Sequence, residues 1–527
     1  MMPISSLNRP LEFVSGLLAD TTLTKKAYLN TLASMLEYAT SLLVGFFLTP
    51  YMVKGLGDYS FGLWQVLSRL IGYLSPASGR PTHALKWTLA NQQASSDYEQ
   101  KRRYVGSALA VWAIFLPVVL GLGCIVAWFV PVWIKAPAEF VWTVRVVAFV
   151  LVSNILLDAL SSIPQGVLQG ENLGYKRMGI TAGLVLFGGG VTWFAIYLKT
   201  GIVGVSFSVL LKTVLAGIVL FLIVSRYVKW FGFAKPLKTD MHVMLGRSGW
   251  FLGWNLVTTL LIASDVVVLG LCSSIVAVTN YSLTKYVPEM MISIIANIIF
   301  AIMPGLGGII GAGDLKRAVR LRSEILSFVW LVVTVIGASV LLLNRSFLEL
   351  WVGTGRFSGA LPHLLIVVGV MQLIFIRSDA NIIDLTLNLS QKVLLGLLSV
   401  AISISAASVM VGYFHMGVVG LCLGIMSGRL ILTAGYPLLI SRFLDIPLSA
   451  QMKGVVRPTL VTILLFSSAL FLDNLLQTMR WPGLHSWIGF FLSAAFAGAV
   501  VLMLSFFGGL TPEQRESISR RVHRAIT

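Results

Sequence analysis

The sequence predicts an all-α, polytopic inner-membrane helical bundle of about fourteen transmembrane helices, arranged as two six-helix lobes plus two extra helices. Hydrophobic residues make up 57% of the 527 residues and charged residues only 11%, whereas soluble domains carry roughly 25% charged residues. The apolar stretches are long enough for spanning helices of about 20 residues. They lack the alternating pattern of an outer-membrane barrel. Composition therefore excludes soluble enzymes, collagen-like chains and disordered chains.

Short polar breaks separate the apolar stretches, and each stretch is one expected span. The spans are residues 28–49, 61–85, 105–130, 141–164, 178–198, 202–224, 247–270, 276–304, 321–343, 361–385, 392–413, 416–438, 458–476 and 486–507. We expect a cytoplasmic N-terminal arm (1–27), an N-terminal six-helix lobe (28–224), a cytoplasmic linker (225–246), a C-terminal six-helix lobe (247–440), helices 13 and 14 (441–508), and a cytoplasmic basic tail (509–527).

Local signals mark breaks and ends of helices. Pro76 and Pro81 interrupt the second span, because proline removes a backbone donor from the helix. In the tail, Thr511 can cap a helix that has Pro512 at its first position. Ile518 then lies on one face of that helix, with arginines nearby. The tail is either a helix on anionic membrane lipid or a solvated segment.

The basic residues set the orientation. Most of the 39 Lys and Arg fall in the termini and in alternate loops. The intervening loops carry only Lys54, Lys135, Lys199, Arg345, Arg356 and Arg480. By the positive-inside rule both termini are cytoplasmic in a bacterial inner membrane. Because the basic residues are dispersed among loops, we expect no nucleic-acid partner. The three cysteines are isolated and the histidines do not cluster, so we expect no metal site and no cofactor.

The chain repeats once, at an offset of about 220 residues. Residues 55–64 read GLGDYSFGLW, and residues 278–285 read VTNYSLTK at the equivalent place. Asp97 and Asp314 each precede a basic cluster in the same loop of their half. Six spans in each half give both halves the same orientation, related by an axis along the membrane normal.

Three segments carry a resemblance to a known family. GLGDYSFGLW, VLQGENLGYKR and PGLGGIIGAGDLKRAVRLR resemble polysaccharide-exporter flippases, the O-antigen-flippase branch of the multidrug, oligosaccharidyl-lipid and polysaccharide (MOP) exporter superfamily. The resemblance covers roughly residues 28–440. It implies two lobes around a central cavity, alternating access, a lipid-linked oligosaccharide substrate for lipopolysaccharide assembly, and glycan polymerase or ligase partners. It assigns no binding residues.

Charged residues also fall within the expected spans, where each costs roughly 2.5–3.5 kcal/mol if it faces lipid at the bilayer centre. They must line a wet path, pair with one another, or lie near an interface. One hypothesis is a cationic cavity for a diphosphate, since Arg and Lys bind phosphate oxygens well. Its candidates are Arg69, Arg80, Arg377, Lys212, Lys285 and Arg429. The alternative is buried ion pairing, as for Lys285 with Glu289 at the i,i+4 spacing.

The acids offer a coupling role. A carboxylate in a cavity can bind H⁺ or Na⁺, and the candidates are Asp265, Asp158, Glu37 and Asp379. The alternative is a structural hydrogen bond or salt bridge. Coupling is not required if the membrane potential alone drives the outward movement of a diphosphate.

The sequence thus favours a flippase that moves a polyprenyl-diphosphate-linked oligosaccharide from the cytoplasmic to the outer leaflet. A cation-coupled small-molecule antiporter of the same architecture is the alternative. An enzyme is disfavoured, because the longest outer break, at 344–360, holds no paired carboxylates, and we assign no catalytic residue. A scaffold leaves the charges within the spans unexplained.

Overall fold

The computed structural model describes residues 23–78, 81–93, 95–385, 389–445, 447, 451, 454–479 and 481–526. Among these residues every regular element is a helix. Twelve of the helices are long and apolar enough to cross a membrane. The predicted all-α polytopic bundle is therefore confirmed.

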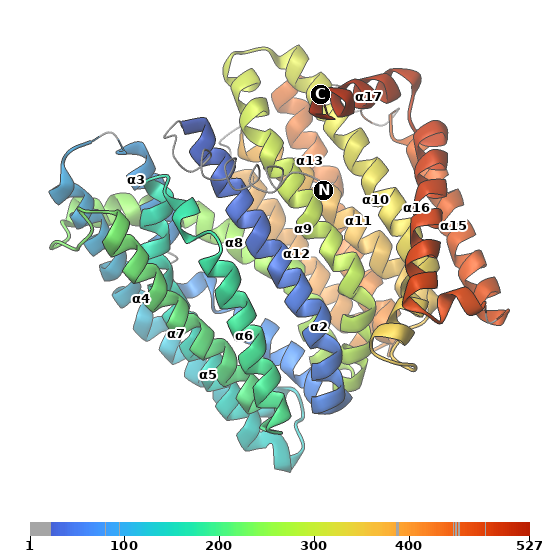
Figure 1. Cartoon of the computed structure of the whole chain (residues 1–527), viewed down its shortest axis with the longest axis horizontal. Coiled ribbons are helices and arrows are strands. Elements are labelled where there is room, and N and C mark those ends of the chain that lie inside the picture. Colours follow the sequence, from blue (N-terminus) through green and yellow to red (C-terminus); the bar gives the residue numbers. More distant parts are fainter. Residues whose placement is uncertain are drawn as a thin grey trace, which may run out of the picture. The chain divides into compact units, whose positions relative to one another are not determined.

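The chain divides into two compact units. Unit 1 contains the described residues up to Ser60 together with Ile71–Leu252, and unit 2 contains Phe61–Leu70 and the described residues from Gly253 onward. The helices of unit 1, besides the first part of α2, are α3 (Pro81–Asn91), α4 (Tyr98–Trp133), α5 (Val141–Gly170), α6 (Ile180–Tyr197) and α7 (Gly201–Tyr227). Figure 1 shows α4, α5, α6 and α7 side by side, with α5 packed against α3, α4 and α7.

The first long helix serves both units. We expected separate spans at 28–49 and 61–85 within one lobe, but α2 runs from Leu23 to Gly72 with one interruption at Gly57. Gly57 has φ 78° and ψ 165°, a conformation that glycine adopts without a side-chain clash. Beyond it, residues 61–70 pack within unit 2. The helix ends ahead of Pro76, and α3 begins at Pro81, so the second expected span is broken at its prolines.

Unit 2 holds most of the remaining helices. They are α8 (Lys238–Cys272, which begins in unit 1), α9 (Ile275–Gly311), α10 (Leu315–Trp351), α11 (Ala360–Asp384), α12 (Leu389–Gly412), α13 (Gly417–Leu444), α15 (Val456–Thr478), α16 (Trp487–Gly509) and α17 (Pro512–Ile526). The pairs α12 with α13, α11 with α13, α9 with α11, and α9 with α10 pack together (Figure 1). Their buried apolar side chains form one core.

Two aspartates at equivalent places of the expected repeat both cap helices. Asp97 accepts a hydrogen bond from the backbone N–H of Gln100 at the start of α4, and Asp314 accepts one from Arg317 at the start of α10. The two helices are 36 and 37 residues long and both end at a tryptophan. The same local sequence signal therefore begins a long helix in each unit, as an aspartate N-cap should.

The last three helices pack against α10 within unit 2. Trp330 of α10 donates a hydrogen bond from its Nε1 to the Thr462 hydroxyl of α15 at 3.0 Å, and its ring packs on Gly509 at the end of α16. The tail helix α17 begins at Pro512, as the sequence predicts, and lies crosswise over α10 (Figure 1). Its Ile518 is buried beside Trp330, so this side chain contacts protein.

Candidate functional site

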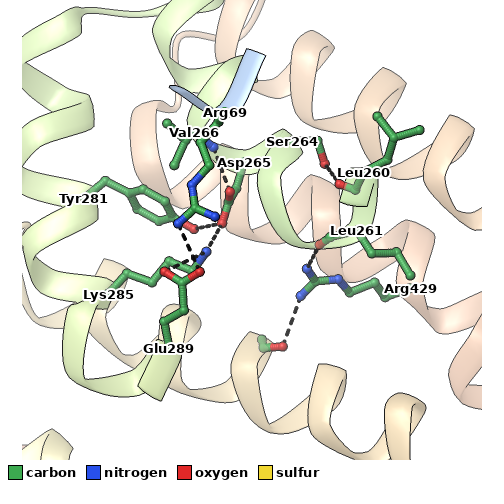
Figure 2. Close-up of polar contacts among 11 residues, drawn as sticks. Arg69, Leu260, Leu261, Ser264, Asp265, Val266, Tyr281, Lys285, Glu289 and Arg429 are labelled. Carbon is green, nitrogen blue, oxygen red and sulfur yellow. Dashed lines mark hydrogen bonds and ion pairs between the residues drawn. The ribbon is translucent and has the colours of Figure 1, made fainter. Parts of the chain in front are cut away.

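Five charged or polar side chains from three helical segments meet inside unit 2 (Figure 2). Lys285 of α9 places its Nζ 2.6 Å from Oδ2 of Asp265 on α8 and 3.7 Å from Oε2 of Glu289. Tyr281 donates its hydroxyl to Oδ2 of Asp265 at 2.6 Å. Arg69, from the last part of α2, places Nη2 3.3 Å from Oε1 of Glu289. We call Arg69, Asp265, Tyr281, Lys285 and Glu289 the ion cluster.

Helix geometry and small residues bring the ion cluster together. Tyr281, Lys285 and Glu289 are spaced four residues apart, so they lie along one face of α9. A Cβ on Gly62 would lie 2.2 Å from the Ile275 carbonyl oxygen, and a Cβ on Gly270 would lie 2.5 Å from Cγ2 of Val66. Because Gly62 and Gly270 have no side chain, the segment that carries Arg69 can approach α8 and α9 closely. Close approach at small residues is the usual packing mode of membrane helices.

Exposure differs across the ion cluster. The Asp265 and Lys285 side chains are 5% and 8% exposed, whereas those of Glu289 and Arg69 are 29% and 34% exposed. Asp265 is held tightly, because Oδ1 also accepts the backbone N–H of Val266 at 2.8 Å. Two cations and two anions balance each other. The ion cluster thus has a buried, tightly paired part and a more open part that contains Arg69 and Glu289.

A small cavity of about 30 Å³ adjoins the buried part, large enough for about one or two water molecules. Asp265, Tyr281 and Lys285 line it together with Cys422 and Arg429 of α13. Arg429 donates Nη1 to the Gly369 carbonyl of α11 at 3.1 Å and Nη2 to the Leu261 carbonyl of α8 at 2.5 Å. Its guanidinium therefore ties three helices together at the edge of the cavity (Figure 2).

Other candidates of unit 2 lie outside that cavity's lining. Asp379 accepts a hydrogen bond from Nη2 of Arg322 at 2.9 Å. The ion-pair partner of Asp379 is therefore on α10 and is not the neighbouring Arg377. Lys392 is fully buried, places Nζ 2.5 Å from Oδ1 of Asp384, and lies over the Trp254 ring at 3.6 Å. Arg377 is half-buried and lies close enough to Lys392 for their charges to interact, and within the described residues it has no ion pair.

The candidates of unit 1 have separate environments. Glu37 pairs with Arg177 at 3.5 Å, with 35% of its side chain exposed. Lys212 of α7 lays its aliphatic stem over Gly188 of α6. Asp158 is on an exposed face of α5. Arg80 lies outside the described residues.

Sequence reasoning assigned no role in the site to Glu289 or Tyr281. The signal for both was present, because 281, 285 and 289 repeat at the helical spacing. No local pattern in the sequence indicates that Arg69 pairs with Glu289, which lies far away in the chain. Among the described residues no group of three or more His, Cys, Asp or Glu side chains is arranged to hold a metal ion.

Residues 27–309 match the model of a protein family described as "Polysaccharide biosynthesis protein". The chain is 21% identical over 520 residues to the "Uncharacterized membrane protein EpsK" of Bacillus subtilis (strain 168), covering 95% of this chain and 98% of that one.

Two solved structures share the fold. One, titled "Lipid II flippase MurJ, inward closed conformation", has a TM-score of 0.65 and 12% identity, over 90% of this chain and 98% of that chain. The other is an outward-facing multidrug resistance MATE family transporter of the MOP superfamily, with a TM-score of 0.52 and 16% identity, over 81% of this chain and 97% of that chain. These likenesses agree with the resemblance found in the sequence. The chain is a multi-pass membrane protein that belongs to the polysaccharide biosynthesis protein family.

Proposed function

We propose that this protein is a flippase that moves a polyprenyl-diphosphate-linked oligosaccharide from the cytoplasmic to the outer leaflet of the bacterial inner membrane by alternating access. The observation that carries the proposal is an arginine and a lysine placed together within the helices of a polysaccharide biosynthesis family member. The fold likeness to a protein titled as a lipid II flippase is consistent with it. The cargo would serve surface polysaccharide such as O-antigen, delivered to a glycan polymerase or ligase.

Arg69 is the residue to which we assign the first contact with the diphosphate. Its side chain is 34% exposed, so an anion can approach it without unfolding the helix. A guanidinium can bind phosphate oxygens through two parallel hydrogen bonds. Lys285 lies on the other side of Glu289 and supplies a second positive charge. The lipid tail would stay in the bilayer while the head group moves through the protein.

The membrane potential favours this direction of transport. Moving each negative charge outward across an inside-negative membrane releases about 2.3 kcal/mol per 100 mV. Uptake of H⁺ or Na⁺ at Asp265, Asp158, Glu37 or Asp379 is an additional route to coupling. In the structure Asp265, Glu37 and Asp379 each have a cationic partner.

The decisive experiment uses the native host depleted of this protein. We expect a diphosphate-linked glycolipid to accumulate in a form shielded from an externally added glycosidase, and its mass identifies the cargo. Accumulation on the outer side would instead indicate a later polymerase or ligase step. Unchanged glycolipids in cells with intact surface glycan would refute the flippase and favour the antiporter.

Complementation of the depleted host tests the site. Arg69→Gln should abolish rescue while membrane insertion stays normal. Arg345→Gln is the matched control, because Arg345 is also a partly exposed arginine paired with a glutamate, at 3.5 Å from Glu349. Arg345→Gln should rescue fully. Equal rescue by both variants would remove Arg69 from the site.

A further inference from the structure

The carboxylate of Glu289 forms ion pairs with both cations that the proposed function assigns to the diphosphate. One oxygen faces Arg69 at 3.3 Å and the other faces Lys285 at 3.7 Å (Figure 2). A phosphate group offers the same chemistry, namely two oxygens that accept from neighbouring cations. Glu289 therefore stands where a bound anion would make its contacts.

Of the two carboxylates in the ion cluster, that of Glu289 is held less tightly and is the easier one to displace from its cations. Asp265 accepts three hydrogen bonds at 2.6–2.8 Å and is 5% exposed. Glu289 makes two longer contacts and is 29% exposed. A partly exposed ion pair contributes little to stability, whereas removing one partner of a buried pair leaves an uncompensated charge. An incoming anion thus displaces Glu289 far more readily than Asp265.

The charge balance of the ion cluster explains what Glu289 contributes when no substrate is bound. With Glu289 in place, Arg69 and Lys285 are neutralised by two carboxylates. Without Glu289, Arg69 would be a partly buried cation that has lost its ion-pair partner, which is costly within a membrane. An internal carboxylate satisfies Arg69 when no substrate is bound, at the expense of weaker substrate binding.

We propose that Glu289 is an internal competitor for the substrate: it holds Arg69 and Lys285 in the empty protein, and the diphosphate must displace it to bind. This inference rests on the proposed function, because it takes the diphosphate as the incoming anion. It assigns Glu289 the role of setting affinity. Weak, reversible binding suits a transporter, which must release its cargo on the other side of the membrane.

The test measures binding of a fluorescent polyprenyl diphosphate to the purified full-length chain in lipid nanodiscs, with the same labelled polyprenyl alcohol as reference. Glu289→Gln should bind the diphosphate on the order of fivefold more tightly, the worth of one partly exposed ion pair. Glu289→Ala is a second variant that removes the same charge. Glu349→Gln is the matched control, because Glu349 is 28% exposed and paired with Arg345, and its affinity should equal the wild type's.

A double-variant cycle locates the effect at Arg69. Arg69→Ala should weaken diphosphate binding, and the gain from Glu289→Gln should shrink in the Arg69→Ala background, because only the competition at Lys285 then remains. If the wild type binds the diphosphate over the alcohol but both Glu289 variants bind it no more tightly, the competitor role is overturned and the flippase proposal stands. If no variant distinguishes the diphosphate from the alcohol, both proposals fall.

Discussion

The ammonium of Lys285 lies 2.6 Å from a carboxylate oxygen of Asp265, and less than a tenth of either side chain is exposed. This pair joins α9 to α8. In a low-dielectric interior each charge depends on the other, because an uncompensated buried ion loses its hydration without replacement.

Breaking this pair should destabilise the protein strongly. We expect Lys285→Met to cost about 3–5 kcal/mol, the usual result of leaving one buried charge unpaired. Adding Asp265→Asn in the same chain should recover most of that loss, because the asparagine oxygen can still accept from Tyr281. Thermal unfolding of the purified protein followed by tryptophan fluorescence measures both. A double variant no more stable than Lys285→Met would contradict the pairing.

The approach of the Arg69 segment to α9 depends on Gly62. We expect Gly62→Ala to displace this segment, because the added Cβ would lie 2.2 Å from the Ile275 carbonyl and 2.7 Å from the Thr279 hydroxyl. The unfolding temperature should fall, and so should complementation of the depleted host. Gly72→Ala is the control on the same helix, since a Cβ there meets no atom within 4 Å. Equal behaviour of the two alanine variants would show that the close contact is unimportant.

Arg429 should be sensitive to even a conservative change. Its two terminal nitrogens donate to carbonyls on α8 and α11, and the compact ammonium of lysine cannot reproduce this fork. We expect Arg429→Lys to lower stability by about 1.5–3 kcal/mol, the typical worth of a hydrogen bond to a charged group. Arg442→Lys, at an exposed position of the same helix, should leave the unfolding temperature unchanged. The assignment fails if both variants unfold at the wild-type temperature.

The attachment of the last helices should depend on Gly509. An added Cβ there would lie 1.9 Å from the Trp330 ring, whereas one at Gly508 would lie 3.6 Å from the nearest atom of Val461. Gly509→Ala should therefore loosen α16 and α17 from α10 and increase proteolysis of the tail. Gly508→Ala should be cleaved at the wild-type rate. Measuring the rate of trypsin cleavage after the tail arginines distinguishes the two, and equal rates would exclude the proposed contact.

Local features of the fold were predictable because they depend on short stretches of chain. Asp97 and Asp314 mark the starts of α4 and α10 because aspartate is a favourable N-cap, and Pro512 begins α17. The sequence places the break between the first two spans at residues 50–60. It does not predict that the interruption is confined to Gly57, with helical geometry on both sides of it. The prolines that follow were sufficient to predict the interruption of the second span.

The sequence by itself determined which charges lie within the spans and that Tyr281, Lys285 and Glu289 share one helix face, because helical periodicity is a local property. Only the tertiary structure decided that Glu289 faces Arg69 and that Asp265 faces Lys285. Those pairings depend on the rotation and close packing of helices far apart in the chain, which Gly62 and Gly270 permit. Periodicity places a side chain on a helix, but contacts between helices select its partner.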